Sequence, residues 1–181
     1  MLRRLTAAAE LVDWVGSDRL SLVKLDKGWP SHFTCHTKTG KVPLAVHLSP
    51  ITLSKRKRDF VERRFQNPGQ NRPVVAASGE YPIMLGYEEI SGQRVLVGMD
   101  GEKRLGKRTR QSLFMPVNLL PAGIAKGWEE HVSTAKERIV AFVPPLLPFF
   151  VETYRSGQVV SRKEIREALK EAGVNPLPPD A

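Results

Sequence analysis

Apolar residues recur along the chain with two different periods, and each period predicts a different kind of element. Leu5, Ala8, Val12 and Val15 follow helical spacing, and Gly16 is a natural stop for the helix that they form. Alternating or continuous apolar stretches bounded by turn residues predict strands instead. The expected elements are helices over 5–15, 54–64, 116–126, 144–154 and 161–172, and strands over 20–25, 42–48, 82–87, 94–99, 112–115 and 138–143.

Two local patterns are especially specific. The apolar segments 82–87 and 94–99 are joined by a short polar stretch, which predicts an antiparallel hairpin. Ser161 and Glu164 have the spacing of a capping box, with Val160 and Ile165 placed as a hydrophobic staple around it. Residues 27–40 predict a loop or a short hairpin, and residues 66–73 predict an exposed polar loop.

Helices and strands alternate without regular βαβ order, so the sequence predicts an α+β fold. We expect a single domain with a mixed or mainly antiparallel sheet flanked by helices. Its expected bounds are 1–174, and the Pro-rich residues 175–181 are expected to be a tail or linker.

The composition fits a globular chain: of 181 residues, 41% are hydrophobic and 26% are charged. The single Cys35 excludes an internal disulfide and favours a reducing, cytoplasmic setting. The longest nearly apolar stretch, residues 139–151, contains three prolines and is too short to span a membrane, so no membrane partner is expected.

The net charge of the chain indicates a polyanionic partner. The 28 Lys and Arg residues against 19 Asp and Glu residues give a net charge of +9, which favours a nucleic acid as partner. The alternative is that the basic surface only aids solubility. The densest positive run, the first basic cluster, lies on the expected helix 54–64, where a solvated helix face or a targeting signal is the alternative to phosphate binding. Its members are Lys55, Arg56, Lys57, Arg58, Arg63 and Arg64.

A second basic cluster follows the predicted hairpin, and Gly106 within it lets the backbone approach a phosphate closely. Arginine and glutamine side chains there are also able to read base edges. The residues expected to contact nucleic acid are Arg104, Lys107, Arg108, Arg110 and Gln111. The two clusters form one footprint only if the fold brings them to one face.

The loop 66–73 is rich in side chains that hydrogen-bond to bases, and it directly follows the first cluster. Its candidate contacts are Gln66, Asn67, Gln70 and Arg72. An ordinary polar turn is the alternative.

Trp29 and Phe33 are candidate platforms for base stacking, with core packing as the alternative. The nearby His32, Cys35, His36 and His47 raise the question of a metal site. A strand that turns Phe33 and Cys35 to the core and His32 and His36 outward accounts for them better, so no metal is expected.

No complete catalytic centre is present in the sequence. Asp100 and Glu102 do not stand two residues before Lys103, as a nuclease (D/E)-x-K motif requires. The chain has no Cys-His framework, phosphate-binding glycine loop or G-x-S-x-G elbow, so no catalytic residue and no cofactor are expected. Glu129, Glu130 and His131 are read either as an acid/base group or as a solvated helix end.

The central and C-terminal stretch resembles accessory domains of bacterial restriction systems, of the kind found before HNH nuclease modules. The residues that carry the resemblance are YPIMLGYE at 81–88, VLVGMD at 95–100, GKRTRQS at 106–112, GW at 127–128 and ERIVAFVP at 137–144, within about 60–155. The resemblance implies a module for DNA recognition or modification sensing, with cleavage in a separate nuclease domain or subunit.

The sequence therefore predicts a non-catalytic DNA-binding domain of a restriction or defence system, with double-stranded DNA favoured. One alternative is an RNA-binding module. A second is a metal-dependent nuclease with dispersed acids such as Glu80, Glu89, Asp100 and Glu102. A third is a protein-interaction module whose basic faces only solubilise it.

Overall fold

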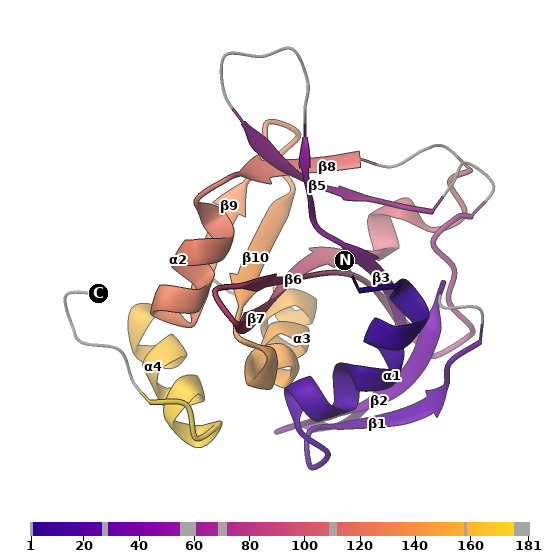
Figure 1. Ribbon diagram of the computed structural model, residues 1–181. Coiled ribbons are helices and arrows are strands. Elements are labelled where there is room, and N and C mark those ends of the chain that lie inside the picture. Colours follow the sequence, from indigo (N-terminus) through magenta and orange to yellow (C-terminus); the bar gives the residue numbers. More distant parts are fainter. Residues whose placement is uncertain are drawn as a thin grey trace.

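The fold of the chain is described from a computed structural model (Figure 1). It covers residues 2–26, 29–54, 61–68, 72–108, 112–157 and 159–175. A seven-stranded sheet with the order β1-β2-β3-β6-β7-β10-β9 forms the centre. Its strands are β1 (Leu20–Lys24), β2 (Ser31–Thr37), β3 (Gly40–Pro50), β6 (Tyr81–Ile90), β7 (Gln93–Asp100), β9 (Trp128–Val132) and β10 (Arg138–Phe142).

Only β3 and β6 pair in parallel, and the other neighbours in this sheet pair antiparallel. A second sheet has the order β4-β5-β8, and we call it the small sheet. Its strands are β4 (Thr52–Ser54), β5 (Glu62–Gln66) and β8 (Ser112–Pro116). The mixed sheet and the surrounding helices confirm the predicted α+β class and single domain.

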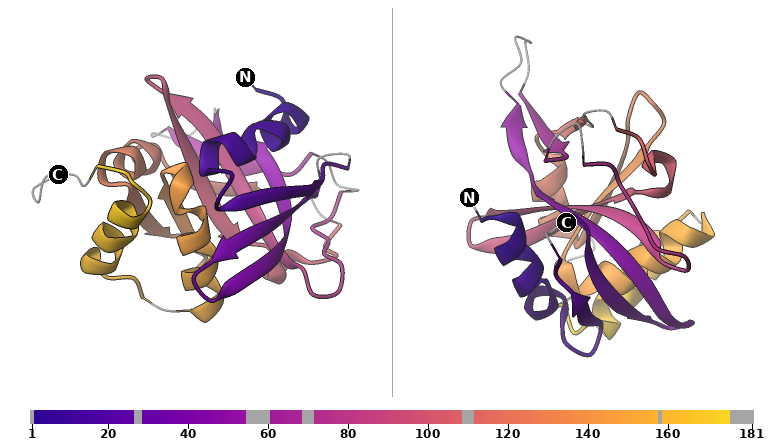
Figure 2. Two further views of the ribbon diagram at one scale, coloured as in Figure 1. Left: turned by 90° about the horizontal axis from the view of Figure 1, so that it is seen from below. Right: turned by 90° about the vertical axis from the view of Figure 1, so that its right-hand side faces the viewer.

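Each face of the large sheet has its own core. Alternate residues of β6 point to opposite faces: Ile83 and Leu85 join one core, and Met84 joins the other. The first core is covered by the helices α1 (Arg4–Val15), α3 (Leu147–Ser156) and α4 (Arg162–Glu171), with the 3-10 turn η2 (Pro144–Leu146) leading into α3. These helices lie in front of the sheet when the molecule is seen from below (Figure 2, left).

The second core is covered by the small sheet, α2 (Leu119–Lys126) and residues near Val74. Figure 1 shows the small sheet above the large sheet, opposite α1 and α3. The 3-10 turn η1 (Glu102–Arg104) follows β7 on the way to β8.

Most predicted elements are confirmed, including the hairpin of β6 and β7 and the capping box of Ser161 and Glu164. Within the segment expected to be a loop or a short hairpin, residues 31–37 form the strand β2, which pairs with β1 and β3. The predicted helix over 54–64 is wrong at both of its ends, since Ser54 closes β4 and residues 62–64 begin β5. Phe65, the residue after this expected helix, is the inward residue of a strand paired with β8.

Candidate nucleic-acid interface

The small sheet connects the sequence features that we expected to contact nucleic acid. In the chain, residues 55–58 of the first basic cluster stand between β4 and β5, and Arg63 and Arg64 lie on β5 itself. The second cluster stands between β7 and β8. The register pairs Ser54 with Glu62 at one end of the sheet and Gln66 with Ser112 at the other. Of the predicted contacts, Lys55, Arg56, Lys57, Arg58, Gln70, Arg110 and Gln111 lie outside the described residues.

The two arginines of the first cluster that lie on β5 point to opposite sides. Arg63 faces the large sheet, where its guanidinium pairs with Glu88 and donates to the carbonyl oxygen of Val117 at 3.3 Å. Arg64 lies on the outer side, in register with Phe114 of β8. Its Nε atom is buried and has no hydrogen-bond partner among the described residues. Arg63 is engaged in an ion pair, whereas Arg64 has none among the described residues, so Arg64 is the better placed of the two for an anion.

The segment 72–80 crosses the second core and is held there by buried side chains. The indole nitrogen of Trp29 donates to the carbonyl oxygens of Arg72 and Pro73, each at 3.1 Å. His47 accepts from the backbone N–H of Val75 through Nε2 at 3.1 Å, and its Nδ1 lies 3.1 Å from the carbonyl oxygen of Ile83. The second contact requires a proton on Nδ1, so the bonds together fix a neutral imidazole.

Burial lowers the pKa of His47 to about 4, although its hydrogen bonds to backbone carbonyls act in the opposite direction. The ring is completely buried, and Trp29 meets it edge-on with 5.0 Å between ring centroids. His47 therefore holds the segment 72–80 as a neutral group at physiological pH.

Backbone pairing joins this segment to the second basic cluster. Val74 forms a parallel bridge with Leu105, and the N–H of Gly106 donates to the carbonyl oxygen of Val74 at 2.9 Å. This pairing brings cations that are distant in sequence to one region of the surface. We call the exposed cations of this region the basic patch, which consists of Arg72, Lys103, Lys107 and Arg108.

Other residues that were predicted to contact nucleic acid are less exposed to solvent. Arg104 pairs with Glu137 and is half-buried. Gln66 closes β5 and donates through Nε2 to the hydroxyl of Ser112 at 3.1 Å, while Asn67 is buried. The prediction of a wholly exposed loop over 66–73 is therefore wrong at its first residues, which the pairing of β5 with β8 draws into the fold.

Trp29 and Phe33 are both buried, Trp29 in the second core and Phe33 in the first. The core-packing alternative is confirmed for both, since neither ring presents an open face for stacking. The histidines near Phe33 have separate roles: His32 binds Glu80 at 2.7 Å, and His36 binds the hydroxyl of Ser21 at 3.0 Å. Cys35 faces the first core, as predicted.

A groove of about 820 Å³ lies along β8, between this strand and the turn that joins β9 and β10. Its walls include the half-buried Phe114, the carboxylate of Glu62 and the paired Arg104 and Glu137. Asn118, His131, Ser133 and Thr134 add uncharged polar groups. The sequence did not indicate this site, because its lining comes from four separate segments of the chain.

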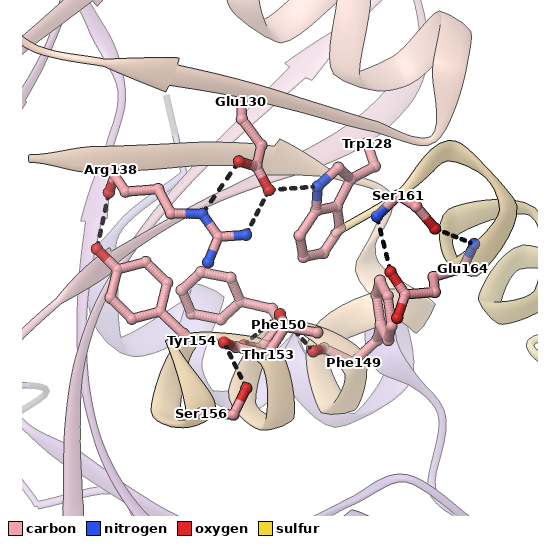
Figure 3. A network of polar contacts seen from close by, with 10 residues as sticks. All are labelled: Trp128, Glu130, Arg138, Phe149, Phe150, Thr153, Tyr154, Ser156, Ser161 and Glu164. Carbon is pink, nitrogen blue, oxygen red and sulfur yellow. Dashed lines mark hydrogen bonds and ion pairs between the residues drawn. The ribbon is translucent and has the colours of Figure 1, made fainter. Parts of the chain in front are cut away.

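Glu129, Glu130 and His131 lie on strand β9, so the predicted helix end is wrong. Figure 3 shows that the carboxylate of Glu130 accepts from the indole N–H of Trp128 at 3.0 Å and from Nε of Arg138 at 3.1 Å. Tyr154 of α3 donates to the carbonyl oxygen of Arg138 at 2.9 Å. Glu130 thus links the edge of the large sheet to the aromatic core beneath it.

The acids that a dispersed nuclease site would use do not converge. Glu80 contacts His32, Glu89 pairs with Arg94, and Asp100 accepts from the N–H of Glu102. Within the described ranges, no three His, Cys, Asp or Glu side chains are grouped so that they could hold a metal ion. The same part of the chain has no helix with the length and apolar character needed to cross a membrane.

A sequence comparison identifies the class of the protein as an accessory domain of restriction-modification systems, and the resemblance seen in the sequence is confirmed. The chain belongs to the family described as methylase-associated X1, which it matches over residues 43–151. This match covers more than half of the 181 residues and includes the small sheet, the basic patch and the groove. No curated protein and no solved structure matches the chain.

Proposed function

We propose that this chain is a non-catalytic nucleic-acid-binding module, with double-stranded DNA as its main ligand. The observation that carries the proposal is the pairing of Val74 with residues 105 and 106. This pairing sets the segment of Arg72 beside the segment that carries Lys103, Lys107 and Arg108, and these four exposed cations are the basic patch. Each lysine or arginine that reaches a phosphate releases condensed counterions, so such a patch supplies affinity that is independent of sequence and sensitive to salt.

The patch is anchored rigidly enough to hold its position. Trp29 and His47, both buried, hydrogen-bond to the backbone on either side of Val74. Preorganised cations lose little conformational entropy at the backbone when they bind, which favours affinity.

The small sheet extends the proposed surface away from the patch. Arg64 lies in the middle of β5 on its outer side. We propose that Arg64, like the patch, binds a phosphate of the nucleic acid.

Family membership supports the biological setting of the proposal. Methylase-associated X1 is the family's description, and restriction-modification systems recognise DNA and its modification state. We assign the chain the recognition or modification-sensing step, with cleavage carried out by a separate nuclease domain or subunit.

The test replaces Arg72, Lys107 and Arg108 with glutamine and measures binding to a labelled DNA duplex by fluorescence anisotropy. We expect affinity to fall by a similar factor for every duplex sequence, because the lost contacts are to phosphates. The matched control replaces Lys163, Arg166 and Lys170, three exposed cations of α4 on the opposite side of the large sheet. This control removes the same charge and should leave affinity nearly unchanged.

Equal affinity of the patch variant and the wild-type protein would contradict the proposal. Competition between the duplex and a structured RNA identifies the preferred nucleic acid. Displacement of the duplex by RNA at lower concentration than by unlabelled DNA would replace DNA by RNA as the main ligand.

A further inference from the structure

The start of α1 carries an arginine that has no acidic partner among the described residues. Arg4, the first residue of this helix, is half-buried and donates through Nη2 to the hydroxyl of Ser49 at 3.1 Å. This hydroxyl donates in turn to the carbonyl oxygen of Gln66 at 2.6 Å. Ser49 is buried, so the two hydrogen bonds fix the guanidinium of Arg4 beside the end of β5.

The charge of Arg4 is not compensated within the described part of the chain. Burial lowers the pKa of Arg4, Tyr87 raises it, and the nearby charge of Arg72 lowers it. The Nε atom of Arg4 is buried and has no hydrogen-bond partner among the described residues. Taking a guanidinium partly out of water costs free energy, and a counter-ion normally offsets this cost.

Other half-buried arginines have such a counter-ion. Arg63 pairs with Glu88, and Arg138 pairs with Glu130. Arg4 departs from this arrangement, because the charged neighbour that acts on it is a second cation. A half-buried cation that is held in place beside another cation is a binding site for an anion supplied from outside the chain.

Arg72 connects Arg4 to the basic patch. Arg72 is exposed and belongs to the patch, and the indole nitrogen of Trp29 holds its carbonyl oxygen at 3.1 Å. Its charge lies close enough to act on Arg4, so the two guanidinium groups form one continuous cationic surface. We propose that Arg4 binds a phosphate of the nucleic-acid backbone and so extends the basic patch to the start of α1, an inference that rests on the proposed function.

A backbone phosphate fits the chemistry of Arg4. A guanidinium presents its N–H donors in a rigid fork, and phosphate oxygens accept from this fork in two parallel hydrogen bonds. The bond to Ser49 preorganises the group, which reduces the entropy lost on binding. A phosphate also brings the negative charge that Arg4 lacks among the described residues.

The experiment measures binding of Arg4→Gln to a labelled DNA duplex by fluorescence anisotropy at several salt concentrations. We expect affinity to fall about tenfold, as the loss of one charge-assisted contact predicts. The plot of the logarithm of the association constant against the logarithm of salt concentration should become shallower by about one unit. Arg4→Lys keeps the charge and should keep the wild-type slope. Arg3→Gln removes the same charge from the exposed preceding residue, and this matched control should keep both affinity and slope.

The slope separates a phosphate contact from a structural role, because a structural role of Arg4 would lower affinity by the same factor at every salt concentration. An unchanged slope in Arg4→Gln, beside a shallower slope in the patch variant, would overturn only the inference about Arg4. An equal change of slope in Arg3→Gln would also overturn it, because the effect would then come from the general charge of the N-terminus. Failure of the wild-type protein to bind the duplex would overturn the proposed function itself.

Discussion

His47 is a buried histidine whose two ring nitrogens are both used by the fold. One faces the carbonyl oxygen of Ile83, and the other accepts from the N–H of Val75. A second proton on the ring would break the contact with Val75. Val75 adjoins the bridge between Val74 and Leu105. Protonation of His47 should therefore weaken the backbone contacts that hold the basic patch in place.

The lowered pKa of His47, about 4 in place of 6.5, makes the stability of the protein depend on pH. Below pH 6.5 the unfolded chain binds a proton at this site and the folded chain does not. The contribution of neutral His47 to the free energy of unfolding is thus complete above pH 6.5 and is lost as the pH falls toward 4. At about 1.36 kcal/mol per pKa unit, roughly 2 kcal/mol should be lost between pH 7 and pH 5. Urea unfolding at the two pH values should show a smaller loss in His47→Gln, whereas the half-buried control His36→Gln should behave like the wild-type protein.

Gly98 is required by the close approach of α3 to the large sheet. A Cβ atom at this position would lie 2.4 Å from the ring of Phe150. Gly98→Ala should therefore lower the free energy of unfolding by about 1–3 kcal/mol, the usual effect of overpacking a core. The double variant with Phe150→Leu should be less destabilised than the sum of the two single variants, as measured by urea unfolding. If the two substitutions lowered the free energy of unfolding additively, the close contact between Gly98 and the ring of Phe150 would be contradicted.

At the scale of elements, local sequence patterns were sufficient to predict some helices and strands but not others. The hairpin of β6 and β7 and the capping box of α4 are determined within a few residues, and both were predicted. β5 contains one buried apolar residue, Phe65, and becomes a strand through its pairing with β4 and β8. β9 was missed for a similar reason, because Trp128 is its only fully buried side chain.

The capping box gives a test at this scale. The hydroxyl of Ser161 accepts from the N–H of Glu164 at 3.2 Å, and the carboxylate of Glu164 accepts from the N–H of Ser161 at 2.7 Å. Ser161→Ala should lower the free energy of unfolding by about 1 kcal/mol. Ser17→Ala, an exposed turn residue, is the control, and an equal effect of the two substitutions would show that the cap does not stabilise α4.

At the scale of the whole molecule, the candidate site depends on tertiary structure. The sequence identified Arg72, Lys107 and Arg108 as candidates one by one, but their convergence requires the bridge at Val74. Arg63 and Arg104 were also expected to bind phosphates, whereas the fold pairs them with Glu88 and Glu137. Asn118 carried no signal, and His131 was noted only beside Glu129 and Glu130, because their neighbours in the groove come from other segments of the chain.

The central claim is that the basic patch binds phosphates, and the salt dependence of affinity tests it most directly. The logarithm of the association constant for a DNA duplex should fall linearly with the logarithm of the salt concentration, with a slope of about −0.9 for each phosphate contact. Removal of the side-chain charges of Arg72, Lys107 and Arg108 should make this slope shallower by about one unit for each cation. The α4 variant with Lys163, Arg166 and Lys170 replaced should keep the wild-type slope. A patch variant with the same slope as the wild-type protein would contradict the account.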